Sequence, residues 1–289
     1  MKDHIIRGMA YNNEVRFFAA YTKDICEESR RIHETSPICT AALGRLLTAG
    51  AMIGSMCKND TDVVTLQIKG DGPAKGLTVT ANAKAEVKGI IYNPVVDLPA
   101  NEAKHLNVGG AIGHGSLSVI KDLGLKDPYV GQTQLVSGEI AEDLTYYFAA
   151  SEQIPTSVGL GVLMTKDNTV EHAGGFIIQL LPFATEETIS ALEDKLSKVK
   201  SVTEYFKEGK DPEEMMKEIL GSDISIEDSI PTQYKCNCSR ERVKKALISI
   251  GKEELEKMIA DGEPVTLKCD FCNTDYKFEI DELKEIVAQ

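Results

Sequence analysis

The chain has 289 residues, 42% of them hydrophobic and 27% charged, which is typical of a soluble globular protein with two or three domains. Its formal net charge of −13 disfavours general binding to nucleic acid, because phosphate contacts require a basic face. No apolar run approaches the roughly twenty residues of a membrane span and no secretory signal is visible, so we expect a cytoplasmic protein without a membrane partner.

Residues 1–182 are predicted to form a mixed α/β domain around a sheet. Helical spacing of leucine and isoleucine predicts two helices after the first strand, divided at Pro37. Two later strands are expected on either side of a polar turn at 166–168, and we expect the sheet to end at Pro182. The earlier strands are indicated by β-branched and aromatic residues between turn formers at 14–21, 62–70, 76–83 and 86–92.

Residues 183–231 are predicted to be an acidic helical connector, with a net charge of −7. From Thr185 onward the apolar residues recur about every three and a half positions. Asp211 and Pro212 suit the cap and the first turn of a further helix. Short helices need a neighbour, so we expect one apolar stripe to lie against another domain. Its residues are Leu192, Leu196, Val199, Phe206, Met215, Met216, Ile219 and Leu220.

Residues 232–289 are predicted to be a small C-terminal zinc-binding domain, which makes the whole chain an α+β protein. Ser239 is expected to cap a helix. Its inward face is predicted to be Val243, Ala246, Leu247 and Ile250. A β-hairpin is expected from two alternating segments, 265–268 and 276–280, whose turn holds a C-x-x-C sequence in the manner of a zinc knuckle.

Four cysteines of this last segment have the spacing of a metal site: Cys236, Cys238, Cys269 and Cys272. Two close pairs of thiolates are the donor set of a closed tetrahedral zinc site. The first pair is C-x-C, one residue shorter than usual, so its thiols would meet each other once the hold of the metal weakens. The spacing alone leaves open whether the site is a structural zinc ribbon or a redox switch.

The remaining reactive residues form no recognisable motif. Cys26, Cys39 and Cys57 lack ligand-like spacing and are expected to be small apolar filling. No phosphate-binding loop, dinucleotide fingerprint or G-x-S-x-G elbow is present, so we expect neither nucleotide binding nor enzymatic activity. The histidines are scattered and are expected to be ordinary surface residues: His4, His33, His105, His114 and His172.

The C-x-C pair followed by SRERV, a long spacer and CDFCN, all after an α/β domain, resembles the heat shock protein 33 family of redox-regulated holdase chaperones, the 33 kDa chaperonins. The resemblance runs nearly end to end. It also includes the segments TAALGRLLTAG, LSVIKDLGL, VSGEIAEDLTYYFAASEQIP and GGFIIQLLP.

The resemblance implies that all four cysteines bind Zn2+ in a reduced, inactive form. It further implies that oxidation joins Cys236 with Cys238 and Cys269 with Cys272, releases zinc and unfolds the C-terminal region. The oxidised form would be a homodimer that binds unfolded or partly folded client proteins without ATP. The fold it implies agrees with the three segments predicted above.

Two other functions stay open as alternatives. The first is an RNA-binding protein with a structural zinc ribbon, which would use a local basic patch of Arg240, Arg242, Lys244 and Lys245. The second is a thiol-disulfide oxidoreductase, although the C-x-x-C here lacks the usual strand-then-helix setting.

Overall fold

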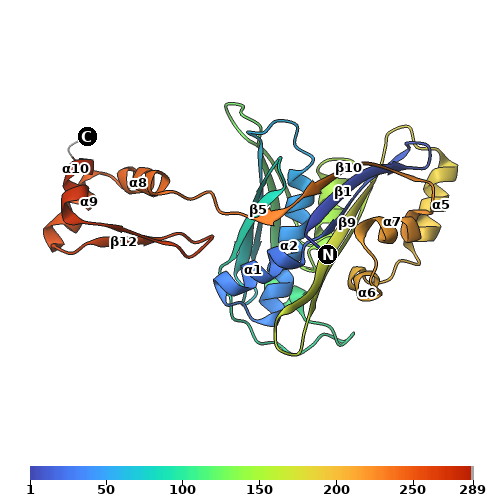
Figure 1. Ribbon diagram of the computed structural model, residues 1–289, viewed down its shortest axis with the longest axis horizontal. Coiled ribbons are helices and arrows are strands. Elements are labelled where there is room, and N and C mark those ends of the chain that lie inside the picture. The colour runs from blue at the N-terminus through green and yellow to red at the C-terminus, as the bar shows by residue number, and fades with distance from the viewer. Residues whose placement is uncertain (288–289) are drawn as a thin grey trace. The chain divides into compact units, whose positions relative to one another are not determined.

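Residues Met1–Lys235 form the first of two units into which the computed structural model divides, and Cys236–Gln289 form the second (Figure 1). The structure describes residues 1–287. The first unit contains two sheets, in which all neighbouring strands are antiparallel except β11 and β5. The first sheet has the order β10 (Ile224–Pro231), β1 (His4–Ala10), β2 (Val15–Tyr21), β9 (Val170–Leu180), β8 (Thr156–Met164). The second has the order β11 (Gln233–Tyr234), β5 (Glu86–Ile91), β4 (Gly76–Asn82), β3 (Val63–Gly70), β6 (Gly115–Asp122), β7 (Tyr129–Gln134).

Helix α2 (Pro37–Gly54) lies between the two sheets and contacts strands of both (Figure 1). Sixteen of its eighteen residues are buried. By length and composition alone the helix could cross a membrane, but 89% of it is buried inside this unit, as in the core helix of a globular domain. Gly50 permits the close approach, since a Cβ there would meet Val79 at 2.6 Å. Helix α1 (Lys23–His33) packs beside α2, and Pro37 divides the two as predicted.

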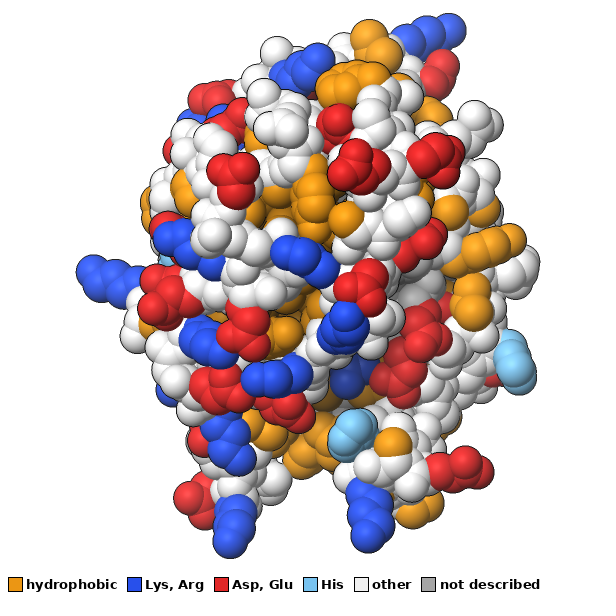
Figure 2. Space-filling model, turned by 90° about the vertical axis from the view of Figure 1, so that its right-hand side faces the viewer, with side chains coloured by type: hydrophobic (Ala, Val, Ile, Leu, Met, Phe, Trp, Pro, Cys, Tyr) orange, Lys and Arg blue, Asp and Glu red, His pale blue; other side chains and the backbone are white. Residues whose placement is uncertain are grey.

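Helices α5 (Glu186–Leu196), α6 (Val202–Lys207) and α7 (Pro212–Leu220) cover the other face of the first sheet. Their predicted apolar stripe is confirmed: Met215 and Met216 are fully buried there, beside Phe17 of β2 and Phe176 of β9. Figure 2 views this side of the unit, where acidic and basic side chains are mixed and hydrophobic side chains show between them.

The helical connector is shorter than predicted, because residues 224–231 form β10 at the edge of the first sheet. The expectation that the sheet ends at Pro182 is therefore wrong. Ile224, Ile226 and Ile230 alternate with exposed residues along this strand, and β10 pairs with β1 from Ile224–Ala10 to Pro231–His4. This period of two is the signal of a strand. Two further helices complete the unit, α3 (Val108–Ile112) and α4 (Ala141–Ala150).

The second unit contains α8 (Arg240–Ser249), α9 (Lys252–Asp261), a hairpin of β12 (Val265–Lys268) and β13 (Asp275–Phe278), and α10 (Ile280–Val287). The predicted hairpin is confirmed. The predicted inward face of α8 is only partly correct, since Leu247 is buried but Ala246 and Ile250 are exposed. The core of this unit is small, with five buried residues among 236–287: Leu247, Leu255, Phe278, Leu283 and Ile286.

Candidate metal centre

Two separate segments of the second unit carry the four cysteines. Cys236 and Cys238 lie in an extended stretch that ends at Ser239, whose Oγ accepts a hydrogen bond from the Arg242 N–H at 3.3 Å and caps α8. The other two cysteines lie in the turn of the β12–β13 hairpin. In an extended segment, residues i and i+2 point to the same side, so the first pair can present both sulfur atoms to one point.

The turn that holds the second pair is fixed by the backbone. The N–H groups of Cys272 and Asn273 both donate to the Cys269 carbonyl, at 3.3 and 2.8 Å, and the Cys269 N–H donates to the Thr274 carbonyl at 2.9 Å. Asn273 has φ of 58°, the left-handed conformation that asparagine tolerates better than most residues. The chain thereby reverses tightly enough to turn both thiols inward.

The structure brings all four sulfur atoms within 4.8 Å of one another. The Sγ atoms of Cys236 and Cys269 are 3.7 Å apart, and those of Cys238 and Cys272 are 3.3 Å apart. Four thiolates around a tetrahedral zinc ion at about 2.3 Å would be separated by about 3.8 Å. All seven cysteines of the chain have free thiols. The four clustered cysteines thus have the spacing that a metal ion requires, and could hold one.

Each of the two short sulfur contacts joins a cysteine of the first pair to a cysteine of the second pair. All four sulfur atoms are nevertheless within 4.8 Å of one another. A metal ion bound by all four would hold the two segments together. The reduced geometry by itself favours no particular disulfide pairing, because each thiol has more than one neighbour within 4.8 Å.

The surroundings separate the acidities of these thiols. Burial raises the pKa of Cys236 and of Cys269 above the ordinary range. Burial also acts to raise the pKa of Cys272, but hydrogen bonds from Thr274 and from the thiols of Cys238 and Cys269 outweigh it and lower this pKa to about 7. Cys272 is therefore converted to the nucleophilic thiolate at neutral pH more readily than Cys236 or Cys269.

Two residues that lie beside the cysteines were not predicted from the sequence. The Tyr276 hydroxyl lies 3.1 Å from the Cys238 Sγ, and the Thr274 hydroxyl lies 3.2 Å from the Cys272 Sγ. The hydrogen bond to Cys238 raises the pKa of Tyr276 to about 12, so its hydroxyl stays a donor. Both residues follow the C-x-x-C sequence, Thr274 directly before β13 and Tyr276 within it, and this position in the hairpin is the signal that could have indicated them.

The basic residues of α8 do not form a uniformly basic surface. Arg240 makes a 2.6 Å ion pair with Glu282, donates to the Lys277 carbonyl at 2.8 Å, and stacks 4.4 Å from the centre of the Phe278 ring. A cavity of about 300 Å³ beside it is lined by acidic as well as basic side chains. This mixed charge does not match the basic face that phosphate contacts require.

The other cysteines lie in the first unit and contribute to packing. Cys26 and Cys39 are buried and Cys57 is half-buried, and burial raises the pKa of each thiol. The expectation of small apolar filling therefore agrees with their surroundings. Of the histidines, His172 lies with its Nδ1 3.2 Å from the Tyr21 hydroxyl, and burial lowers its pKa.

Comparison with known proteins gives one consistent result. The family model described as Hsp33 protein matches residues 3–279. Proteins named 33 kDa chaperonin from Lachnoclostridium phytofermentans and Agathobacter rectalis are 57% and 53% identical to the chain, covering 100% and 99% of it and 99% and 100% of their own lengths. The crystal structure of a 33 kDa chaperonin (Heat shock protein 33 homolog) from Thermotoga maritima is similar with a TM-score of 0.92 at 37% identity, covering 100% of this chain and 98% of that one.

Proposed function

This chain belongs to the Hsp33 protein family, and from that premise we propose that it is a redox-regulated holdase that binds unfolding proteins without ATP. The family is one of chaperones rather than enzymes. In the reduced form we propose that Cys236, Cys238, Cys269 and Cys272 bind Zn2+. Oxidation then joins Cys236 with Cys238 and Cys269 with Cys272, and the protein becomes active under oxidative stress in the cytoplasm.

The observation that carries the proposal is the cluster of four sulfur atoms within 4.8 Å in a unit whose described part, residues 236–287, buries only five core residues. So small a core rarely stabilises a fold by itself. Structural zinc supplies apparent binding energies of about 10 to 16 kcal/mol in comparable peptides. Loss of the metal would therefore remove most of the stability of this unit.

Two-electron oxidation would convert the four thiolates into disulfides, which no longer bind the metal. Bound zinc keeps thiols in the thiolate form. The Cys272 thiolate attacks one oxygen of hydrogen peroxide, which gives a sulfenic acid and hydroxide. The neighbouring Cys269 thiolate then attacks that sulfur and expels a second hydroxide, which leaves a disulfide. The same steps at Cys236 and Cys238 consume a second peroxide. Disulfide sulfurs are poor metal ligands, because the thiolate is the ligand form.

A short strand precedes the metal site along the chain and offers a route by which its unfolding can spread. Strand β11 pairs with β5 over only two residues, and the Lys235 N–H donates to the Val87 carbonyl at 2.8 Å. The ammonium of Lys235 also pairs with Glu86 at 2.5 Å, and the Thr232 hydroxyl donates to the Ala85 carbonyl at 2.6 Å. Cys236 follows directly in the sequence. Release of this short anchor would free the chain toward β10.

The surface that would bind clients lies under the acidic helices. Helices α5, α6 and α7 cover an apolar face of the first sheet that includes Phe17, Phe176 and Ile178. If unfolding reaches this segment, it uncovers a contiguous apolar surface, and such surfaces bind other apolar chains. The net charge of −13 would help to keep the complexes with clients soluble. We further propose that the oxidised form is a homodimer.

Oxidation of one sample, with three properties followed together, tests the proposal. Hydrogen peroxide with mild heating should release about one zinc per chain, remove four free thiols and let the protein suppress light scattering by a chemically denatured client. Cys272→Ser should bind zinc more weakly than the parent does. Its suppression of light scattering by the client should no longer depend on the oxidant. Cys57→Ser, which changes a cysteine outside the cluster, serves as the matched control and should behave as the parent does.

The proposal fails if zinc leaves and the four thiols disappear while client aggregation proceeds unchanged. Peptide mapping of the oxidised chain checks the disulfide pairing separately, because bonds between Cys236 and Cys269 would contradict the near-neighbour arrangement. Size measurement before and after oxidation tests the dimer.

A further inference from the structure

Strand β8, at one edge of the first sheet, has no charged residue, whereas the strand at the opposite edge has charged residues. Among the described residues β8 pairs only with β9. Its sequence, TSVGLGVLM, holds neither charged residues nor proline. Strand β10, at the opposite edge, has Glu227, Asp228 and Pro231. Proteins normally place charges or proline on edge strands, because an open apolar edge pairs with other chains. Strand β8 lacks this protection.

The unpaired backbone groups of β8 can be assigned from one hydrogen bond. The Val158 N–H points away from β9 and donates to the Thr145 Oγ1 of α4 at 3.2 Å. In an antiparallel ladder the backbone groups of alternate residues point the same way. The N–H and carbonyl groups of Leu160 and Val162 therefore also point away from β9. Helix α4 covers the first part of the edge, and the second part lies beyond it.

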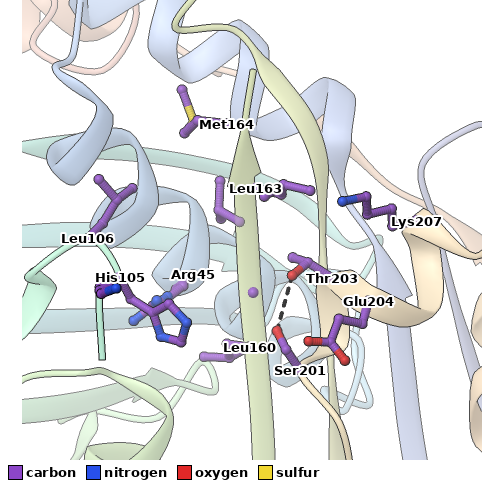
Figure 3. Close-up of a pocket in the computed structure, with 13 residues that line it drawn as sticks. Arg45, His105, Leu106, Leu160, Leu163, Met164, Ser201, Thr203, Glu204 and Lys207 are labelled. Atoms are coloured by element: carbon purple, nitrogen blue, oxygen red, sulfur yellow. Dashed lines mark hydrogen bonds between the residues drawn. The ribbon is translucent and has the colours of Figure 1, made fainter. Parts of the chain in front are cut away.

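A cavity of about 510 Å³ runs beside this second part of the edge, from Leu160 to Met164. Its walls come from both sides of the first sheet. In Figure 3, β8 passes between one wall, formed by α2 and the loop before α3, and another formed at the start of α6 and along it. The first wall contains Arg45, His105 and Leu106, and the second contains Ser201, Thr203, Glu204 and Lys207. Lys104, which precedes His105 in the chain, also lines the cavity.

The charge of the cavity is opposite to that of the chain as a whole. Arg45, Lys104 and Lys207 line it, against the single carboxylate of Glu204. Arg45 makes a 2.5 Å ion pair with Glu139, yet its Nε is buried and has no hydrogen-bond partner in the part of the chain that the structure describes. A basic cavity in a protein of net charge −13 favours an occupant with an acidic group.

We propose that this cavity, which we call the β8 groove, binds an extended apolar segment with an acidic side chain as an added strand. The inference rests on the proposed function, because it takes the occupant to be part of an unfolding client. Backbone hydrogen bonds to Leu160 and Val162 hold any extended sequence, while Lys104 and Lys207 select an acidic one. Addition of a strand to an open sheet edge is a common way of binding peptides, since most of its hydrogen bonds are independent of sequence.

The groove also depends on the helical segment. Its second wall is α6, which packs on β8 and β9. A Cβ at Gly161 would lie 2.8 Å from the Thr203 methyl group, so this wall lies directly against the strand. If the helices leave the sheet on activation, the groove loses this wall and admits bulkier side chains beside the same backbone edge. The β8 groove would then be the first contact of a larger client surface.

Peptide binding to the full-length reduced chain tests the inference. The probe is a fluorescein-labelled nine-residue peptide of alternating valine and threonine with one central aspartate, and its partner has lysine there. The double variant Lys104→Glu/Lys207→Glu should bind the aspartate peptide about three- to tenfold more weakly, as expected for two exposed ion pairs, and the lysine peptide no more weakly than the parent does. Lys126→Glu reverses an exposed charge outside the groove and should change neither affinity.

Hydrogen exchange identifies the backbone contact. Saturating peptide should slow the exchange of the Leu160 and Val162 amides and leave that of Gly161, which faces β9, unchanged. Val162→Pro removes one outward N–H and should lower the affinity by more than tenfold relative to Val162→Ala, which removes the side chain alone. Circular dichroism checks that both variants fold. If Val162→Pro does not, the exchange and charge-reversal measurements decide.

The inference is overturned if the exchange of Leu160 and Val162 is unchanged by bound peptide, or if the charge-reversed chain distinguishes the two peptides as the parent does. These measurements need no oxidation, so they are independent of the proposed activation. Failure of the holdase function would appear only in the oxidised client assay. The oxidised double variant Lys104→Glu/Lys207→Glu is compared with the oxidised parent on an acidic client. Equal protection by the two would contradict client binding in the β8 groove and leave the holdase function intact.

Discussion

At the scale of single residues, one buried carboxylate organises the loop before α4. The Asp143 side chain is fully buried. Its Oδ1 accepts hydrogen bonds from the N–H groups of Val136, Ser137 and Gly138 at 2.7, 3.1 and 3.3 Å, and its Oδ2 accepts from Ile140 at 2.9 Å. Ile140 has φ of 71°, a strained conformation for a β-branched residue. The carboxylate therefore holds a loop that would not keep its shape by itself.

Removing this carboxylate should destabilise the first unit strongly. Asp143→Ala leaves four N–H groups without their acceptor, so we expect the free energy of unfolding to fall by at least about 3 kcal/mol in denaturant titrations. Glu142→Ala, at the exposed neighbouring position, should change it by less than about 0.5 kcal/mol. Equal effects of the two substitutions would mean that the loop is held by other contacts.

A second buried carboxylate should make stability depend on pH. Burial raises the pKa of Asp3 to about 6, although the N–H groups of Ile25 and Asp24 donate to its carboxylate at 2.8 and 3.1 Å. The pKa of an aspartate in an unfolded chain is about 3.9. Between these two values the folded chain holds the proton more tightly than the unfolded chain does. The stability contributed by Asp3 is therefore full below about pH 4 and is lost as the pH rises through about 6.

Asp3→Asn should remove this pH dependence. The free energy of unfolding of the variant, relative to the parent, should rise by roughly 2 to 3 kcal/mol between pH 4 and pH 7.5, measured by amide exchange of the first unit. Asp167→Asn, in an exposed turn, is the control and should show no such trend. A flat difference for Asp3→Asn would show that the folded and unfolded chains bind this proton equally.

At the scale of elements, the ends of the short helices decide how firmly they cover the first sheet. Asp211 caps α7, accepting from the Glu214 N–H at 2.8 Å, while the Glu214 carboxylate accepts from the Asp211 N–H at 3.0 Å. Met215 and Met216 follow and are fully buried. The cap therefore supports the part of the helix that covers apolar sheet surface.

Loss of this cap should loosen α7 more than it unfolds the unit. Asp211→Ala should lower the stability of α7 by about 1 kcal/mol, seen as roughly fivefold faster exchange of its amides. Asp194→Ala removes an exposed acid of α5 that pairs with Lys198 and caps no helix, so exchange in α7 should not change. Faster exchange throughout the first unit would mean that α7 and the sheet open together.

At the scale of the whole molecule, the two units differ in the size of their apolar cores. The first has an extensive apolar core with the buried helix α2, whereas the described residues of the second include five buried core residues and four clustered thiols. Removal of metal should thus unfold Cys236–Gln289 and leave the fold of Met1–Lys235 largely intact.

A strong chelator under reducing conditions tests this difference. The amides of α8, α9 and the β12–β13 hairpin should lose protection from exchange, while those of α2 keep theirs. Addition of zinc should restore the protection. Persistent protection of the hairpin in demetallated, reduced protein would contradict the dependence of this unit on metal.

Local elements were predicted correctly where the spacing of apolar residues, a proline, a capping residue or a turn sequence indicated them. The helix boundary at Pro37, the cap at Asp211 and the hairpin around the C-x-x-C were all predicted correctly. Strands β1, β6, β7 and β11 and helices α3, α4 and α10 were not predicted, and β10 was included in the helical connector. The alternation of isoleucine in β10 is clear only once β1 is known to be its partner.

What the sequence determined by itself was the set of four cysteines that could hold a metal ion and the apolar stripe of the helical segment, because both depend on spacing along the chain. Only the tertiary structure decided which residues from distant segments meet. It placed Tyr276 beside Cys238, gave Asp143 its four N–H partners, and left part of the β8 edge open beside a basic cavity. Such contacts join residues far apart in the chain or depend on the exact course of a loop, and no local pattern in the sequence specifies them.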